Sequence, residues 1–216
     1  MFSLGLWQLD RLGERRDRNR EIAVAIEEPV RPFADVVAGS NSRYARVTIS
    51  GTYRPDGEAL VGNRTLDGAP GFWVLGVLDT EAGPVAVLRG FANRSLVLND
   101  SIPPPPPGEQ TIAGYVEYRV DGVARQNEWL ELNRPDTRAL AEALGLELPD
   151  EFVVADVSTG GLVAVERPPI GDGPHLSYAV QWFIFATIAG VGYIVLLRRM
   201  AQTGGGTREQ SDSLRP

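Results

Sequence analysis

Residues 177–197 read SYAVQWFIFATIAGVGYIVLL and carry no charged side chain. An α-helix rises about 1.5 Å per residue, so a run of this length crosses the roughly 30 Å of a bilayer's hydrocarbon core. A helix buried in a protein core is the alternative, but the length of the run and its abrupt end at Arg198 and Arg199 favour a membrane span. Aromatic residues that suit a membrane–water interface lie toward both ends, at Tyr178, Trp182 and Tyr193.

The two arginines after this run also predict its orientation. Basic residues that flank a membrane helix stay on the cytoplasmic side, so the C-terminus is predicted to be cytoplasmic and the preceding residues extracytoplasmic. All 21 basic residues are Arg, and with 24 Gly and 16 Pro this composition is typical of a GC-rich bacterial genome. We therefore expect the cell membrane as the location, with residues 201–216 as a disordered cytoplasmic tail.

The first 28 residues predict a juxtamembrane helix and the exit end of a second membrane helix. Leu4 to Trp7 is apolar but too short to span a bilayer, and no basic segment of a signal peptide precedes it. Leu9 to Glu27 is rich in Arg and Glu, with apolar residues at loosely helical spacing. We expect a start codon assigned too far downstream, so that the first membrane helix is truncated.

Residues 29–170 show strand patterns and make up the predicted extracytoplasmic domain. The clearest is RVTISGTY at 46–53, which alternates between apolar and polar positions. Residues 55–57, Pro-Asp-Gly, predict a turn into a return strand at 59–62. Later strand patterns occupy 72–78, 85–91, 110–118, 152–157 and 162–165.

Short strands at roughly ten-residue spacing indicate an antiparallel sheet or a small barrel. Gly51 and Gly114 stand within strands and predict bulges or tight bends. Residues 135–144 predict a helix that Gly145 ends. The predicted fold class is membrane-anchored α+β: a β-rich soluble domain with peripheral helices, followed at 171–200 by a linker and a C-terminal transmembrane helix.

Composition excludes several classes of function. The net charge of −7 argues against nucleic acid as a partner, because a phosphate-binding surface needs clustered excess base. The chain has no Cys and one His, His175, so it has no thiol chemistry and cannot build a copper site alone. With no G-x-S-x-G elbow and no phosphate-binding glycine loop either, we do not expect an enzyme.

Three separated stretches resemble the surfeit-locus-one family, the Surf-type assembly factors of cytochrome c oxidase. They are LGLWQLDR at 4–11, NRTLDGAPGFWVL at 63–75 with VLRGF at 87–91, and PHLSYAVQWFIFA at 174–186. The resemblance covers nearly the whole chain in the right order, and the third stretch is the most specific. The family is a hairpin of two membrane helices with a β-rich domain between them, outside the membrane.

The resemblance implies a role in the maturation of haem-copper oxidase by handling haem a for subunit I. Implied partners are cytochrome c oxidase subunit I, the haem a synthesis machinery and membrane lipid. The departure from the family pattern is the first membrane helix, of which only Leu4 to Trp7 is present. This departure agrees with the expectation of a truncated start.

A haem site needs an axial ligand, an apolar slot and partners for the propionates. His175 is the possible iron ligand, and on a continuing helix Tyr178 and Trp182 follow on the same stripe, with Phe185 and Ala189 beyond. Arginine recognises carboxylates bidentately, so candidate propionate partners are Arg11, Arg64 and Arg89. The alternative for His175 is an interfacial residue that caps the helix.

Two functions from different classes remain open. The first is a haem-handling assembly factor, which needs His175 and the apolar stripe. The second is a membrane scaffold that stabilises nascent oxidase subunits without binding haem, which needs an exposed patch on the β domain. A membrane-anchored domain of unrelated role is a third alternative.

Overall fold

The computed structural model describes residues 2–39, 42–158, 160–168, 170–171 and 175–204. Two compact units divide the chain. A β unit spans Glu21–Pro169, and a helical unit consists of Met1–Arg20 together with Ile170–Pro216.

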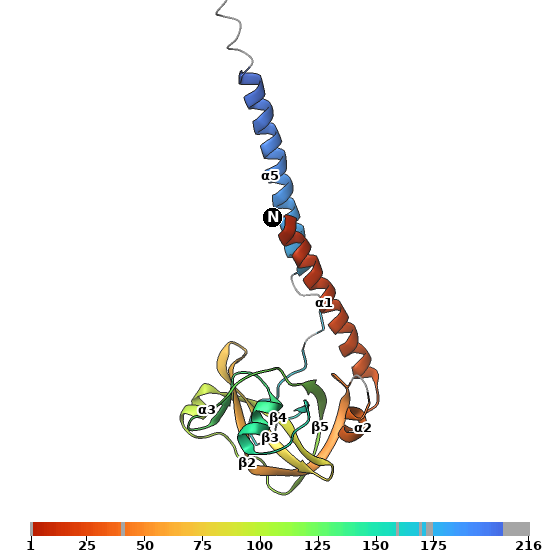
Figure 1. The fold of residues 1–216 in the computed structure, drawn as a ribbon, viewed down its shortest axis with the longest axis vertical. Helices are drawn as coiled ribbons and strands as arrows, with labels where there is room; N and C mark the ends of the chain where they lie inside the picture. The colour runs from red at the N-terminus through yellow and green to blue at the C-terminus, as the bar shows by residue number, and fades with distance from the viewer. Residues whose placement is uncertain (1, 40–41, 159, 169, 172–174, 205–216) are drawn as a thin grey trace, which may run out of the picture. The chain divides into compact units, whose positions relative to one another are not determined.

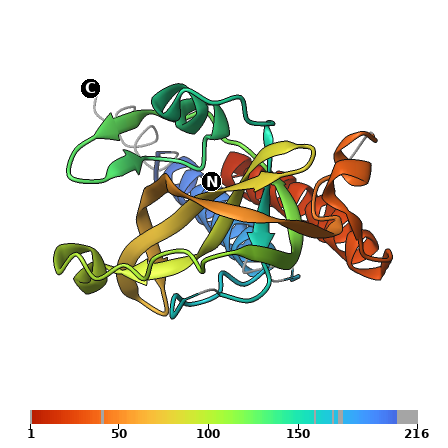
Figure 2. The same ribbon diagram turned by 90° about the horizontal axis from the view of Figure 1, so that it is seen from below.

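A closed ring of five strands forms the β unit. The 21-residue strand β2 (Arg46–Leu66) pairs with β5 through its first part and with β3 through its second part, so one strand closes both sides of the ring. The remaining pairings are β3 with β4, β4 with β8 and β8 with β5. Figures 1 and 2 show these strands curving around a common interior. The other strands of the ring are β3 (Ala69–Thr80), β4 (Gly83–Asn93), β5 (Glu109–Tyr118) and β8 (Glu151–Ala155).

Shorter elements decorate this barrel. The hairpin of β6 (Ala124–Gln126) and β7 (Leu130–Leu132) joins β2 through β7, and β1 (Arg31–Pro32) joins the start of β2. Two single-turn helices, α2 (Phe33–Val37) and α3 (Arg94–Leu98), lie at its periphery. The predicted fold class is confirmed, with the refinement that the sheet is mixed: β1–β2, β2–β7 and β4–β8 are parallel.

The turn predicted at residues 55–57 is wrong. β2 runs through these residues without reversing, and its pairing with β3 instead shifts register between Tyr53 and Glu58. An extra residue in one strand makes a bulge that bends and twists the strand. Pro, Asp and Gly therefore mark the bend at which β2 leaves β5 and continues along β3.

The two glycines within strands serve close approach of backbones, and the predicted bulges are absent from the β2–β5 and β5–β8 ladders that contain them. A Cβ on Gly51 would lie 2.3 Å from the carbonyl oxygen of Asp79, and one on Gly114 would lie 2.2 Å from that of Val154. Both distances are far below van der Waals contact, so a side chain at either position would force neighbouring strands apart.

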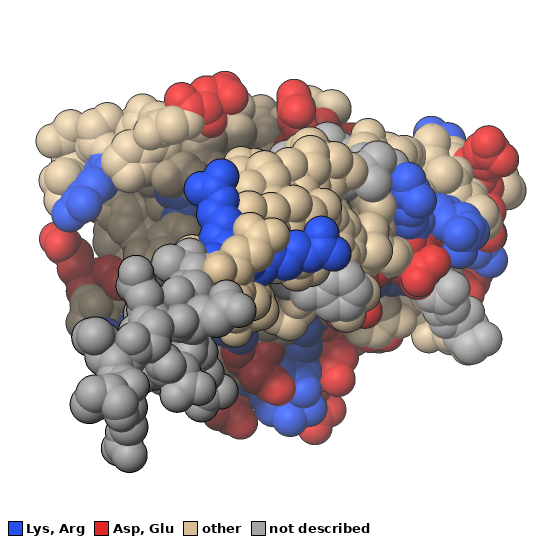
Figure 3. Space-filling model, turned by 90° about the horizontal axis from the view of Figure 1, so that it is seen from above, with Lys and Arg blue, Asp and Glu red and all other residues tan. Residues whose placement is uncertain are grey.

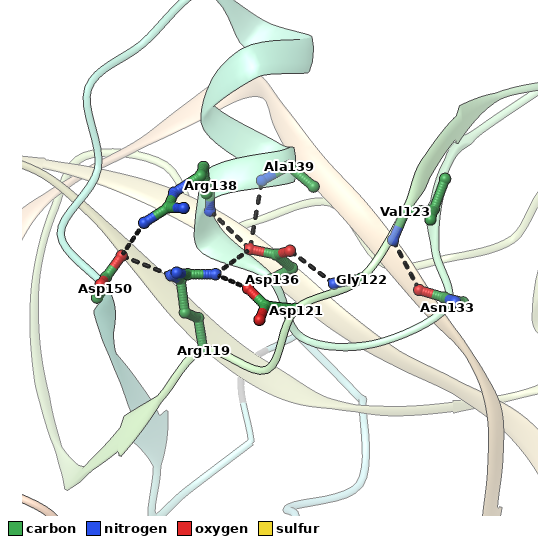
Figure 4. A network of polar contacts seen from close by, with 9 residues as sticks. All are labelled: Arg119, Asp121, Gly122, Val123, Asn133, Asp136, Arg138, Ala139 and Asp150. Atoms are coloured by element: carbon green, nitrogen blue, oxygen red, sulfur yellow. Dashed lines mark hydrogen bonds and ion pairs between the residues drawn. The ribbon is translucent and has the colours of Figure 1, made fainter.

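Helix α4 (Thr137–Leu144) is fixed by its caps. The Asp136 side chain accepts hydrogen bonds from the backbone N–H groups of Arg138 (3.0 Å) and Ala139 (3.4 Å), and Gly145 ends the helix in the left-handed region at φ 67°. The end at Gly145 confirms the prediction, whereas the start lies at Thr137 because Asp136 is the cap. Figure 4 shows how Arg119 joins this cap to the neighbouring carboxylates of Asp121 and Asp150.

Apolar side chains from all five ring strands fill the barrel. Val61, Leu75 and Leu88 belong to one buried cluster, which also contains Leu140 of α4 and Ile22 from the end of α1 (Phe2–Glu27). Strands β3 and β4 are buried over long uninterrupted stretches, because both of their faces are covered. Full burial of one such side chain contributes about 1.5–3 kcal/mol.

The helical unit holds the first part of α1 and all of α5 (His175–Gly204). Ser177–Gln202 is long and apolar enough to cross a membrane, and it contains the predicted span 177–197. The Arg15 guanidinium donates a 2.6 Å hydrogen bond to the Gly171 carbonyl, which ties α1 to the segment before α5. Helix α5 continues through Gly204, four residues into the predicted tail. Residues 205–216 of that tail lie outside the described residues.

Candidate functional site

Helix α5 presents a line of aromatic side chains directly after its first residue, His175. The His175 side chain lies outside the described part of the chain. Tyr178 is 48% exposed and Phe185 is 43% exposed, and Trp182 between them is half-buried. The Trp182 and Phe185 rings meet edge to face with centroids 6.0 Å apart. Since residues three and four apart share one helix face, Tyr178, Trp182 and Phe185 form an aromatic face of α5.

A different face of α5 carries a shallow apolar hollow of about 350 Å³. The only hydroxyl at this hollow belongs to Thr187, and it donates a 2.8 Å hydrogen bond to the Phe183 carbonyl within the helix. This bond removes a polar group that would otherwise face lipid without a partner. The hollow therefore offers an apolar surface, lined by Val180, Phe183, Ile184, Thr187 and Ile188.

Arg11 lies on α1 within the helical unit. Its guanidinium forms a 2.6 Å ion pair with Glu14, one turn along the helix, and its central carbon lies 5.6 Å from the centre of the Trp7 ring. Both partners of the ion pair are about half exposed, and an exposed pair of this kind contributes about 0–1 kcal/mol. Arg11 can therefore exchange Glu14 for another carboxylate at little cost.

Arg89 lies inside the β unit, which argues against its predicted contact with a propionate. Its side chain is fully buried on β4, forms an ion pair with Glu58, and donates hydrogen bonds to the carbonyls of Pro103 (3.2 Å) and Pro104 (3.0 Å). Burial raises the pKa of Glu58 despite the Arg89 charge beside it, because desolvation outweighs that attraction. Arg89 therefore ties the proline-rich segment to the barrel, and we do not propose it as a ligand contact.

Arg64 lies near the end of β2. Its guanidinium carbon lies 4.2 Å from the centre of the Trp73 ring, a cation–π contact. Burial and the nearby charge of Arg134 both lower the pKa of Arg64. Among the described residues, the buried Nε of Arg64 has no hydrogen-bond partner.

A cavity of about 770 Å³ opens beside Arg64. Two further arginines line it, Arg94 at the start of α3 and Arg125 on β6, together with the carboxylate of Glu131. The sequence did not single out Arg94 or Arg125, because neither belongs to a motif and the β6–β7 hairpin has no strong strand pattern. The other lining residues are Gly62, Asn63, Thr65, Pro70, Gly71, Phe72, Val123, Leu132 and Asn133.

The three arginines predicted to meet propionates thus occupy three different environments. Arg11 is exposed on a helix, Arg64 lines a cavity and Arg89 is enclosed. Within the described residues, no group of three or more His, Cys, Asp or Glu side chains could hold a metal ion. On the face drawn in Figure 3, basic and acidic residues lie interspersed.

Comparisons with known proteins place the chain in a family. The sequence model of the SURF1 family matches residues 1–187. An uncharacterized SURF1-like protein of Mycobacterium bovis is 26% identical over 210 residues, covering 88% of this chain and 74% of that protein. A SURF1-like protein of Rickettsia conorii is 27% identical over 218 residues, covering 92% and 87% respectively. Because the family match takes in most of the chain, this protein belongs to the SURF1 family.

Proposed function

We propose that this chain is a membrane assembly factor for haem-copper cytochrome c oxidase that holds haem a as cargo for subunit I. The observation that carries the proposal is the aromatic face of α5, which follows directly on His175. Membership of the SURF1 family supports the oxidase as the target. Haem a is cargo in this role, so no catalytic step by the chain is proposed.

The residues of α5 suit a flat, apolar metal complex. Imidazole is a common axial ligand of haem iron, and His175 is the only imidazole of the chain. The exposed rings of Tyr178 and Phe185, with Trp182 between them, offer a surface on which a porphyrin can stack. Arg11, whose pair with Glu14 is exposed, is the propionate partner that we propose within the helical unit.

The proposed location is the bacterial cell membrane, with the β unit on the extracytoplasmic side. Ser177–Gln202 is the proposed membrane span, and Arg198 and Arg199 near its end favour a cytoplasmic C-terminus. In this orientation His175 begins the helix at the outer surface. Oxidase subunit I and the haem a synthesis machinery are the proposed partners.

The test is the optical spectrum of the detergent-purified full-length protein, co-expressed with haem a synthesis. Wild type should show a Soret band that His175→Ala loses. Phe183→Ala is the matched control, because Phe183 lies on a different face of the same helix and should leave the band unchanged. His175→Gly should regain the band when imidazole is added, since free imidazole can occupy the vacated ligand position.

The hollow on the other face of α5 favours a second candidate, the scaffold, with its contact surface on α5 in place of the patch expected on the β domain. Ile184 is 51% exposed and Ile188 is 64% exposed, and an apolar helix surface of this kind suits packing against a membrane helix of an oxidase subunit. Photo-crosslinkers at positions 184 and 188 would capture such a subunit. If wild type carries no haem while these positions crosslink to an oxidase subunit, the scaffold replaces the haem carrier.

A further inference from the structure

The cavity beside Arg64 concentrates positive charge in an acidic protein. The chain has a net charge of −7, yet Arg64, Arg94 and Arg125 line this cavity with Glu131 as the one carboxylate among the described lining residues. The three arginines come from β2, α3 and β6, so the fold gathers them from segments that are distant in sequence. Such convergence of like charges opposes folding unless something compensates it.

Several other arginines of the β unit have carboxylate partners. Arg43 pairs with Glu117 at 3.1 Å, and Arg54 pairs with Asp79 at 2.8 Å. No ion pair of Arg64, Arg94 or Arg125 is found among the described residues. A counter-charge that the described chain does not supply is what a bound anion would bring.

Arg64 shows this imbalance most clearly. Its Nε is buried and, among the described residues, without a hydrogen-bond acceptor, and an unsatisfied buried donor is destabilising. Its guanidinium is held in place by the Trp73 ring at 4.2 Å, so its position is already organised. Arg134 adds a further positive charge nearby, and burial and this charge lower the pKa of Arg64.

The rest of the lining is partly apolar. Pro70, Phe72, Val123 and Leu132 supply hydrocarbon surface beside the arginines. A volume of about 770 Å³ lies within the range of roughly 300–1,000 Å³ typical of small-molecule sites, which combine apolar walls with a few polar groups. Both features suit a ligand with an anionic head and an apolar body.

We propose that this cavity binds a small amphipathic anion, whose carboxylate or phosphate head pairs with Arg64, Arg94 and Arg125. The apolar body of the ligand packs against Phe72 and its neighbours. The lining of this cavity includes no residue of the aromatic face of α5, and the proposal does not depend on His175, so it holds whether or not the protein carries haem.

The first experiment is calorimetric titration of the full-length protein in neutral phosphatidylcholine nanodiscs with phenyl phosphate. Saturable binding that weakens with salt is expected. Inorganic phosphate should bind more weakly because it lacks the apolar body, and benzyl alcohol should not bind because it lacks the charge.

Variants locate the site. Arg125→Gln and Arg64→Gln should each weaken phenyl phosphate binding about tenfold, the loss expected for one charge-assisted hydrogen bond. Glu131→Gln should tighten binding, because it removes the negative charge from the lining. Arg43→Gln is the matched control, an arginine of the same unit outside the cavity, and should bind as wild type does.

The same titration in nanodiscs containing phosphatidylglycerol separates two sources of the anion. Weaker apparent binding there would identify lipid headgroups as competitors for the cavity. Unchanged binding would identify a soluble anion. Either result keeps the site, whereas equal affinity in wild type, Arg125→Gln and Glu131→Gln, or no binding of phenyl phosphate by wild type, would overturn it.

Discussion

The Arg89 guanidinium on β4 meets the Glu58 carboxylate on β2 across the intervening strand β3, at the position of Gly76. Glu58 and Gly76 are partners in the β2–β3 ladder. A Cβ on Gly76 would lie 3.0 Å from Cδ of Arg89 and 3.2 Å from the Tyr53 ring. Because Gly76 has no side chain, the Arg89–Glu58 ion pair and the Tyr53 ring can both pack against it.

Breaking this pair should destabilise the β unit strongly. Arg89→Met leaves a carboxylate that is only 12% exposed without its partner, at an expected cost of about 3–5 kcal/mol in the free energy of unfolding. Thermal or urea unfolding of the full-length protein measures the loss. The double variant Glu58→Leu/Arg89→Met should recover much of it, because no buried charge is left unpaired.

The matched control for this pair is Arg54→Met. Arg54 and Asp79 form a partly exposed ion pair in the same unit, and its loss should cost far less stability than loss of the buried pair. If Arg54→Met and Arg89→Met lower the free energy of unfolding equally, burial of the Arg89–Glu58 pair does not raise the cost of breaking it.

The burial of Arg89 was not predicted from the sequence. The sequence indicated that VLRGF belongs to a strand, and it made Arg89 a candidate partner for a propionate without indicating that the side chain is buried. Burial depends on which groups cover each face of a strand. Arg89 is covered by Tyr53 and Glu58 of β2 and by the carbonyls of Pro103 and Pro104, and no local pattern within β4 encodes these contacts. The signal that could have revealed burial is the apolar run PVAVL at 84–88 directly before Arg89.

The membrane helix and most strands were predictable, because each depends on a local pattern of hydrophobic residues. The continuous, bulged course of β2 was not predictable, because a Pro-Asp-Gly sequence suits a turn. Only the pairing of β2 with both β5 and β3 shows that the strand continues through these residues. The cavity at Arg64 was not predicted, although Arg64 itself was a candidate partner for a propionate. Arg94 and Arg125 reach it through tertiary contacts that no local pattern encodes.

Acid should weaken the β unit in part through Asp121. The hydrogen bond from Arg119, and then its charge, lower the pKa of Asp121 below its ordinary value of 3.8. A folded-state pKa below the unfolded value gives stability that is present above pH 3.8 and is lost as the pH falls through the lower folded-state pKa. Asp121→Asn should therefore lower the thermal midpoint slightly at pH 6 and show less further loss between pH 4 and pH 3 than wild type.

The control for this comparison is Glu142→Gln, an exposed carboxylate on α4 without an ion pair among the described residues. Its thermal midpoint should follow the wild-type pH profile. An Asp121→Asn profile parallel to that of wild type would show that the contact with Arg119 drawn in Figure 4 does not couple to folding.

Gly114→Ala should disrupt the barrel seam between β5 and β8. The added methyl group would lie 2.2 Å from the Val154 carbonyl oxygen and 2.8 Å from a methyl group of Val153, so the strands must separate. Overpacking of this kind typically costs about 1–3 kcal/mol. Gly62→Ala is the control, since its nearest neighbour would lie at 3.8 Å, and equal thermal midpoints for the two variants would contradict the argument.

The orientation of α5 can be read with reporters fused after the last residue. A C-terminal green fluorescent protein should fluoresce and a C-terminal alkaline phosphatase should be inactive, because Arg198 and Arg199 predict a cytoplasmic C-terminus by the positive-inside rule. The double variant Arg198→Gln/Arg199→Gln keeps the length of the apolar run but removes the charges that favour a cytoplasmic C-terminus. It should therefore raise phosphatase activity. An active phosphatase on the unaltered chain would place the β unit in the cytoplasm, and His175 would then begin the helix on the side opposite to that proposed.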